Sequence, residues 1–469
     1  MNTMHLPVLY LTLFVSLFLG FAFGEVEKKV SLQENDRVLI LAPHPDDESI
    51  GTGGIIQEAI AKKNPIKVVY YTNGDSNELA FIVYEKKLLF NRKDFLKMGE
   101  VRRKEAINAM DVLGLEQENL VFLGYPDFGT MHIFTQYWGD TKPFKSLLTK
   151  VRKVPYPECL SPKAPYVGES ILKDLKTVIT DFKPTKIFVT SPVDYNRDHR
   201  SLYLFLRVVL WDLEGTITMP EVICYLVHCL EWPMPRGCYP NLSLDPPKVL
   251  KDSDIVWKEY NLDPEQIRKK HDAIMCYKSQ NEYNPLYLLS FARKNELFGN
   301  YPEIIVENND TYEVVDGDVI QLNGLIEPEE HIESASCAKR NGNLYFKIKI
   351  KKMRHDFKGL ELYLFGYRKN TPFSGMPKIR ISVQNDRDVV IHDKRKSVRA
   401  EGYYYIMRGN DIYLKVPLSG LGNPEYILAS GRTYKGVLPY YTTSWRVLEI
   451  GQKTSVSQPS DLIKGEKNE

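Results

Sequence analysis

The chain has 469 residues, of which 43% are apolar and 26% are charged, and its formal net charge is +2. This composition excludes a mostly disordered or collagen-like chain, and the near-neutral charge gives no reason to expect a nucleic-acid partner. The length predicts more than one domain, because single hydrophobic cores stop growing near about 250–300 residues.

The N-terminal segment is apolar over residues 6–23, and the first 24 residues contain no Lys, Arg, Asp or Glu. This pattern predicts a secretory signal peptide over 1–24, and therefore a periplasmic or extracellular protein. An uncleaved anchor is the alternative, because an apolar stretch of this length can just span a bilayer. We expect membrane contact only through this leader, and only if it stays uncleaved.

The next part of the chain alternates short apolar runs with amphipathic stretches. The predicted strands are 37–42, 67–72, 120–123, 186–190 and 222–227, and the predicted helices are 51–61, 101–113, 171–182 and 199–213. Strands with few charges, separated by helices, indicate a Rossmann-like α/β fold with a parallel sheet and helices on both faces. We assign residues 25–305 to this domain, and expect its ligands beyond the carboxyl ends of the strands.

After residue 310 the period of hydrophobicity becomes two. Leu344, Phe346 and Ile348 alternate with more polar residues, and 412–418 repeats the pattern. This predicts an all-β sandwich domain over 310–452, followed by a polar tail over 453–469. The sandwich could bind carbohydrate through aromatic residues such as Trp445, or could bury them in its core.

Charge is unevenly distributed over this second half. Residues 301–333 contain ten acidic and no basic residues, whereas 339–399 contain 17 basic and five acidic residues. Such asymmetry can mark a binding face. The lysines alternate with apolar residues, which favours instead a solvated sheet face whose charge the acidic neighbour neutralises.

The run His-Pro-Asp-Asp-Glu at 44–48 directly follows the first predicted strand. It places His44, Asp46 and Asp47 at a carboxyl end, where two of them can bind a metal while one carboxylate stays free. The best third ligand is His199, which follows Asp198 just past the fourth predicted strand. Two His and one carboxylate, with water in the open position, form a catalytic zinc arrangement. The structural alternative is a helix N-cap and an ordinary helical His; their joint placement at two strand ends favours a site.

These residues resemble the LmbE-like (PIG-L) family of zinc-dependent N-acetylglucosamine deacetylases. The resemblance covers about 35–285 and rests on an ordered set of short motifs. Besides the run at 44–48, the set comprises Thr72-Asn-Gly-Asp75, Arg102-x-x-Glu105, Phe122-Leu-Gly-Tyr-Pro-Asp127, Asp198-His199 and Tyr277-x-Ser279-Gln280. It implies an enzyme that hydrolyses the amide of an N-acetylated sugar or glycan substrate.

The resemblance also implies roles for single residues. His44, Asp47 and His199 would hold one Zn²⁺ per chain, with Asp46 as the general base. Asp198 would orient the site from behind the ligands.

Two further residues, Asp127 and Arg102, would lie near the sugar. The alternatives, a loop cap for Asp127 and a surface charge for Arg102, stay open. His132, a few residues after Asp127, could also line the cleft.

One position departs from the family pattern. Asn196 stands where many members have a His that is thought to assist the oxyanion or the leaving amine. Asn can donate a hydrogen bond but cannot protonate an amine. His228, at the end of a predicted strand, is either a substitute for that His or a packed strand-end residue. Two other functions therefore stay open: a weakened or inactive glycan-binding protein, and an amidase for a non-sugar amide.

Overall fold

The computed structural model describes residues 29–76, 91–251, 253–306, 332–352, 359–384, 389–435 and 438–450. The predicted leader, the polar tail and most of the acidic segment lie outside the described residues. No helix in the described ranges is long and apolar enough to cross a bilayer.

The first half of the chain is built on a seven-stranded sheet with the strand order β3-β2-β1-β4-β5-β7-β6. The first five strands in this order are parallel, as predicted. The strands are β1 (Val38–Ala42), β2 (Ile66–Thr72), β3 (Leu120–Tyr125), β4 (Lys186–Thr190), β5 (Glu221–Tyr225), β6 (Val256–Asn261) and β7 (Asn295–Asn300).

The last two strands add an antiparallel edge to the predicted parallel sheet. β7 pairs antiparallel with β5, and β6 pairs antiparallel with β7. The sequence did not show them because they lack the apolar run of a strand buried on both faces; β6, at the sheet edge, has no fully buried residue.

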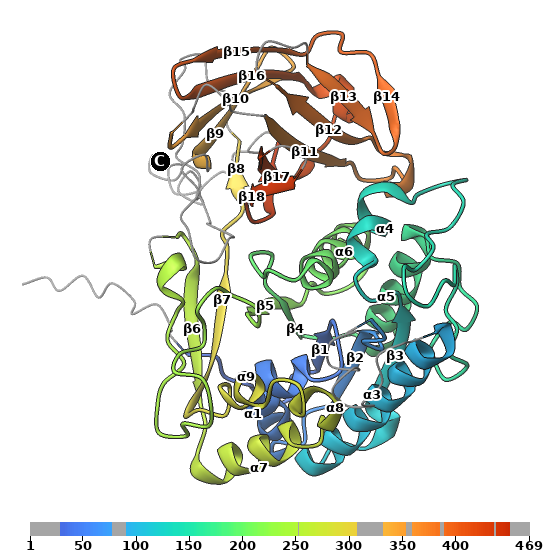
Figure 1. Ribbon diagram of the computed structural model, residues 1–469, viewed down its shortest axis with the longest axis vertical. Coiled ribbons are helices and arrows are strands. Elements are labelled where there is room, and N and C mark those ends of the chain that lie inside the picture. The colour runs from blue at the N-terminus through green and yellow to red at the C-terminus, as the bar shows by residue number, and fades with distance from the viewer. Residues whose placement is uncertain are drawn as a thin grey trace, which may run out of the picture.

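Helices cover both faces of the sheet (Figure 1). One layer contains α1 (Asp47–Ala61), α3 (Arg92–Leu113), α7 (Pro264–Ile274), α8 (Lys278–Asn281) and α9 (Pro285–Leu289). The other contains α4 (Thr130–Gln136), α5 (Gly168–Phe182) and α6 (Arg197–Leu213). α3 begins well before the predicted start at 101, because Asn91 and Asp94 form a capping box. It ends, as predicted, at Gly114, which adopts a φ of 93°.

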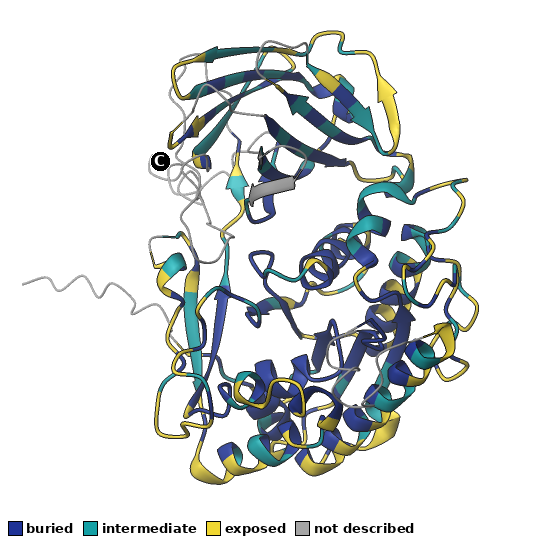
Figure 2. Cartoon of the chain, in the orientation of Figure 1, coloured by how far each residue is buried: buried dark blue, intermediate teal, exposed yellow. Residues whose placement is uncertain are grey.

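The second half is a sandwich of two sheets with the orders β15-β16-β10-β9 and β14-β13-β12-β11-β17-β19-β8. Alternate side chains of β10, from Leu344 to Ile350, are buried in the core between the sheets, which confirms the period-two prediction (Figure 2). The strands are β8 (Ile304–Ile305), β9 (Ile332–Arg340), β10 (Asn343–Ile350), β11 (Leu360–Tyr367), β12 (Lys378–Val383), β13 (Val390–Asp393), β14 (Lys396–Val398), β15 (Tyr404–Arg408), β16 (Asp411–Pro417), β17 (Tyr426–Lys435), β18 (Leu438–Thr442) and β19 (Arg446–Glu449). The fold is therefore α/β followed by an all-β part.

An aromatic cluster joins the two halves. Phe134 of α4 lies with its ring centroid 5.8 Å from that of Phe365 and 6.3 Å from that of Trp445. Phe205 of α6 packs against the same Phe134 ring at 4.9 Å. Trp445 is only 5% exposed, so it belongs to the core at this interface. The exact domain boundary near 305–310 stays a prediction.

Candidate metal centre and active site

The loops after β1 and β4 carry the predicted ligands. β1 and β4 are adjacent parallel strands, so the segment from His44 to Asp47 meets the segment from Asp194 to His199 at one edge of the sheet. α1 begins at Asp47, and α6 begins at Arg197. The topology therefore brings together side chains that are distant in sequence.

Three donor atoms form a nearly equilateral triangle in this loop pair. Asp47 Oδ2 lies 3.2 Å from Nδ1 of His44 and 3.1 Å from Nε2 of His199. The two ring nitrogens lie 3.2 Å from each other. A tetrahedral zinc ion with bonds of about 2.0–2.1 Å separates its ligand atoms by about 3.3 Å. These residues, one of the described groups whose atoms could hold a metal ion, therefore fit zinc.

Carboxylates stand behind both imidazole rings. Oδ2 of Asp198 and Oδ1 of Asp127 lie 3.4 and 3.2 Å from Nε2 of His44. Oδ2 of Asp194 lies 3.1 Å from Nδ1 of His199. A carboxylate at the far nitrogen orients a ligating ring and increases its basicity. The structure thus places Asp198 where an orienting residue belongs.

Asp194 is a site residue that sequence reasoning missed. Its Oδ2 accepts hydrogen bonds from the backbone N–H groups of Val227 and His228, at 3.0 and 2.8 Å. Although burial disfavours its charge, His199 and His228 lower the pKa of Asp194 to about 2, so it is ionised at neutral pH. The sequence signal that could have identified Asp194 is its position after the same strand as His199.

The site carries an excess of buried negative charge. Although burial disfavours a charged ring, Asp194 and Asp47 raise the pKa of His199 to about 9. Burial raises the pKa of Asp46 to about 8, even though Arg102 lies 3.0 Å from its Oδ2. A cation bound among these carboxylates would offset the cost of burying them.

A cavity of about 200 Å³ opens beside the triangle. Six of the predicted site residues line it: His44, Asp46, Arg102, Asp127, Asn196 and His228. Asp47, His199 and Asp198 lie behind these and are almost completely buried. The cavity therefore gives a substrate access to one side of the metal ligands.

Arg102 is not a surface charge, because it is only 3% exposed. Its guanidinium donates to the backbone oxygens of Pro45 and Gly74, at 2.7 and 3.1 Å, as well as to Asp46. Asp127 accepts a hydrogen bond from the backbone N–H of Ser76 at 3.0 Å. Arg102 therefore fixes the loop between the first strand and α1.

The position that departs from the family pattern also lies at the cavity. Asn196 is the N-cap of α6, and its side-chain oxygen accepts a hydrogen bond from the N–H of Asp198 at 2.8 Å. His228 lies with its ring centroid 4.6 Å from that of His199. Burial lowers the pKa of His228 to about 4, so its ring is neutral at neutral pH. His132 is not in this cavity; it lines another one.

Comparisons with known proteins found one curated relative. A glucosamine-6-phosphate deaminase-like protein of Bacteroides thetaiotaomicron is 23% identical over 287 residues, covering 53% of this chain and 36% of that protein. The chain thus spans about a third of that relative's length.

Among solved structures, the matches include two proteins of low sequence identity. N,N'-diacetylchitobiose deacetylase from Pyrococcus horikoshii is 17% identical, with a TM-score of 0.35 and coverage of 57% of this chain and 86% of its own. GalB, the 4-carboxy-2-hydroxymuconate hydratase of Pseudomonas putida KT2440, is also 17% identical, with a TM-score of 0.32 and coverage of 57% and 98%.

The family model described as PIG-L, GlcNAc-PI de-N-acetylase, matches residues 39–210. This match spans His44, Asp47 and His199 and confirms the resemblance seen in the sequence. Residues 39–210 of the chain are therefore similar to the PIG-L family.

Proposed function

We propose that this protein is an exported, zinc-dependent amidase that removes the acetyl group from an N-acetylglucosamine-type sugar. The observation that carries the proposal is the triangle of donor atoms, 3.1–3.2 Å on each side, with the free carboxylate of Asp46 in the adjoining cavity wall. Support for the sugar comes from the matching family model, whose description names a GlcNAc-linked substrate. Export rests on the apolar segment within residues 1–24.

The metal role falls to His44, Asp47 and His199. When bound there, Zn²⁺ supplies a Lewis acid for the acetamide carbonyl and lowers the pKa of a water molecule to about 7. Asp198 and Asp194 hold the two rings in the orientation that keeps one nitrogen of each directed at Asp47.

Asp46 is the proposed general base. It takes no part in the ligand triangle, and its carboxylate faces the cavity. Arg102, 3.0 Å away, holds it in place. In this role Asp46 accepts a proton from the attacking water and returns it to the leaving amine, so one group serves both half-steps.

The test is acetate release by the zinc-loaded chain from N-acetylglucosamine, its oligomers and cell-wall glycans. We expect Asp46→Asn to lower kcat by about 10²-fold or more while zinc stays bound, because general-base catalysis contributes about that much. Asp181→Asn, on the exposed face of α5, is the matched control and should keep full activity. Release that persists in Asp46→Asn, or after chelation, would refute the mechanism.

A weakened enzyme is the second candidate, because Asn196 uses its side-chain oxygen to cap α6 and has no proton to give an amine. His228, in the same cavity wall, is the proposed substitute hydrogen-bond donor. The rates of the variants Asn196→His and His228→Ala distinguish a weakened enzyme from an enzyme in which His228 replaces the missing His. An increase in rate for the first, with no change for the second, would exclude the substitute role.

A further inference from the structure

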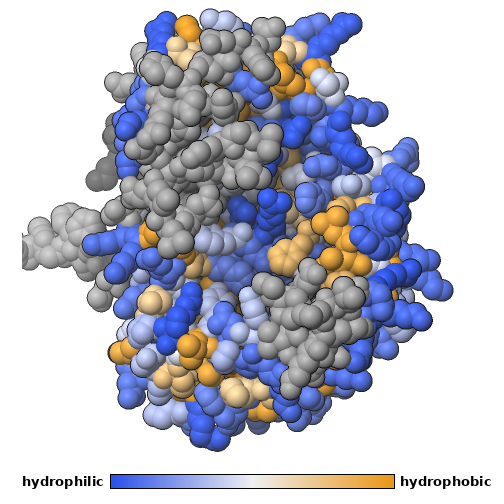
Figure 3. Space-filling view, viewed as in Figure 1, coloured by the Kyte–Doolittle hydropathy of each residue, from blue (hydrophilic) through white to orange (hydrophobic). Residues whose placement is uncertain are grey.

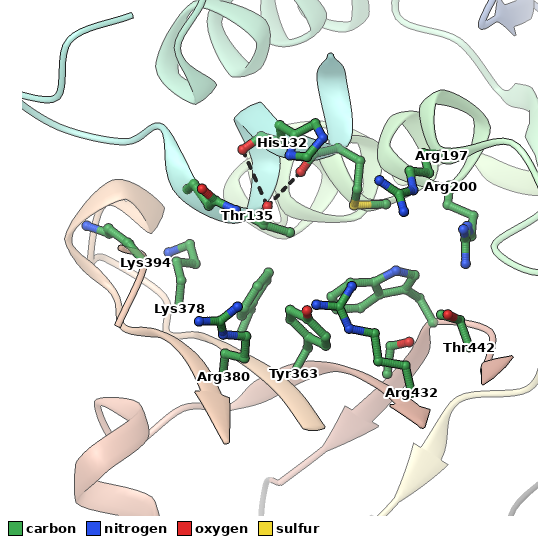
Figure 4. A pocket seen from close by; sticks show the side chains of 15 residues that line it. His132, Thr135, Arg197, Arg200, Tyr363, Lys378, Arg380, Lys394, Arg432 and Thr442 are labelled. Carbon is green, nitrogen blue, oxygen red and sulfur yellow. Dashed lines mark hydrogen bonds between the residues drawn. The ribbon is translucent and has the colours of Figure 1, made fainter. Parts of the chain in front are cut away.

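A second cavity, of about 170 Å³, lies between the two halves of the molecule. Residues of α4 and α6 form one wall, and residues of β11, β12 and β17 form the other (Figure 4). Six basic side chains line it: Arg197, Arg200, Lys378, Arg380, Lys394 and Arg432. No Asp or Glu lines this cavity within the part of the chain that the structure describes.

The basic surplus of residues 339–399 is therefore not simply a solvated sheet face. Lys378 is only 1% exposed, and together with Arg380 and Lys394 it faces the cavity under α4 and α6. Basic and apolar residues do alternate in this segment, but α4 and α6 of the α/β half pack over the end of the sheet that carries Lys378 and Arg380. In Figure 3 hydrophilic residues gather in the hollow between the two halves.

The neighbouring protein groups neutralise only part of this charge. Glu361 pairs with Arg432 at 2.6 Å and approaches Arg380 at 3.7 Å. The ammonium group of Lys378 donates to backbone carbonyls, as does that of Lys394. Burial and the nearby Lys394 lower the pKa of Lys378, as expected where positive charges are crowded.

Two guanidinium groups retain donors without an acceptor. Nε of Arg200 and Nε of Arg380 are buried, and neither has a hydrogen-bond partner among the described residues. Arg200 is itself only 7% exposed. A buried donor without a partner is destabilising, and more so in a charged group, so an anionic acceptor in the cavity would be stabilising.

Aromatic and hydroxyl groups accompany the charges. Tyr363, Phe365 and Trp445 line the sheet wall, and Thr135 and Thr442 add hydroxyl groups. Flat apolar surface beside several cations suits a ring that carries an acidic group. It suits a bare inorganic anion less well, because such an anion makes no favourable contact with the apolar side chains.

The two cavities adjoin along the chain. Asn196 lines the metal cavity, and the next residue, Arg197, lines the second one. Phe128, in the loop before α4, lines the first, and Met131, in the first turn of α4, lines the second. Neighbouring residues of the same two segments therefore line both cavities.

We propose that the cavity between the halves binds the acidic group of a negatively charged glycan whose neighbouring N-acetylated sugar occupies the metal cavity. The inference rests on the proposed deacetylase function and makes its substrate an acidic glycan. The acidic group is a carboxylate, a sulfate or a phosphate, all of which accept charge-assisted hydrogen bonds from Arg and Lys.

The test compares two tetrasaccharides by calorimetry on the zinc-loaded full chain at low salt. Hyaluronan tetrasaccharide alternates N-acetylglucosamine with a uronic acid, and chitotetraose is its neutral counterpart. Inorganic sulfate and phosphate, added as competitors, show which anion the cavity prefers. We expect the acidic probe to bind about tenfold more tightly, because hydrogen bonds to a charged group are stronger than those between neutral groups.

The variant Arg197→Gln/Lys394→Gln removes one cation from each wall and should abolish that preference. Lys269→Gln/Arg399→Gln removes two exposed charges elsewhere and should keep it. Equal affinities for the two probes in the wild type would overturn the inference. So would a preference that survives in the cavity variant.

Acetate release from the same probes separates this inference from the proposed function. A preference for the acidic probe without acetate from any glycan would leave the anion site standing and would remove the deacetylase assignment. Acetate release with equal kcat/KM and equal Kd for both tetrasaccharides would leave the enzyme and remove the anion site.

Discussion

Asp194→Asn tests whether a residue that touches neither substrate nor metal sets the zinc affinity. The carboxylate lies 3.1 Å from Nδ1 of His199, and the pKa of Asp194, about 2, keeps it charged over the working pH range. Asparagine has the same shape without the charge. Nε2 of His199, which faces Asp47, would then be less basic and a weaker metal ligand.

The expected loss is a 10–100-fold weaker zinc affinity, the usual effect of removing such a partner. At about 1.4 kcal/mol per tenfold change this corresponds to about 1.4–2.8 kcal/mol. A further cost falls on folding. Oδ1 of Asp194 accepts from the N–H of Asn196 while Oδ2 accepts from Val227 and His228. One of these positions becomes an NH₂ donor in the variant, which costs about 1–3 kcal/mol.

The assay is competition with a chelator of known zinc affinity, with circular dichroism to establish that the variant is folded. Asp181→Asn, an exposed change on α5, controls for the loss of one charge. A zinc Kd within twofold of the wild-type value, in a folded Asp194→Asn protein, would refute the argument that this carboxylate supports His199.

Three further predictions concern stability. In the wild type the ammonium of Lys270 lies 2.6 Å from the buried carboxylate of Glu296. Lys270→Met should lower the free energy of unfolding by about 3–5 kcal/mol, because it leaves that carboxylate without its cation. A loss below about 1 kcal/mol in urea unfolding would contradict this. Burial and the nearby Asp127 raise the pKa of Asp75 to about 7. The folded protein therefore binds the carboxyl proton of Asp75 more tightly than the unfolded chain does. The stability that this protonated carboxyl contributes at low pH is lost as pH rises from about 4 to 7. The Tm of Asp75→Asn should therefore rise relative to wild type across that window, and a constant difference between pH 4.5 and pH 8 would show otherwise. Removing zinc by chelation should lower the wild-type Tm, because the ion binds only the folded site, and an unchanged Tm would argue against a resident metal.

The α/β half shows why some elements could be predicted from the sequence. The five parallel strands are buried on both faces, so each leaves an apolar run that is readable by itself. β6 could not be predicted in this way, because this edge strand carries charges on its solvent side. β7 is buried between β5 and β6, but its sequence Asn-Glu-Leu-Phe-Gly-Asn contains no continuous apolar run. The start of α3 depended on one capping box, at Asn91 and Asp94, which lies outside the amphipathic repeat.

The metal ligands could be predicted because the rule involved is topological. Residues at the carboxyl ends of neighbouring parallel strands meet, so the strand pattern brought the run at 44–47 together with His199. The choice of Asp47 over Asp46 as the ligand came from the resemblance to the PIG-L family. Asp194 lies on the same loop as His199, but its part depends on the direction of its side chain. Only the folded loop shows its carboxylate behind the ring.

The sequence by itself thus determined the fold class, through local periodicity, and the triad of candidate ligands, through their strand-end positions and the resemblance to the PIG-L family. The tertiary structure alone decided the charge environment. Lys378 and Arg200 are far apart in the chain, and only the packing of the sandwich against α4 and α6 brings them to one cavity. Burial and proximity are pairwise properties of the folded molecule, and a linear pattern of charges does not contain them.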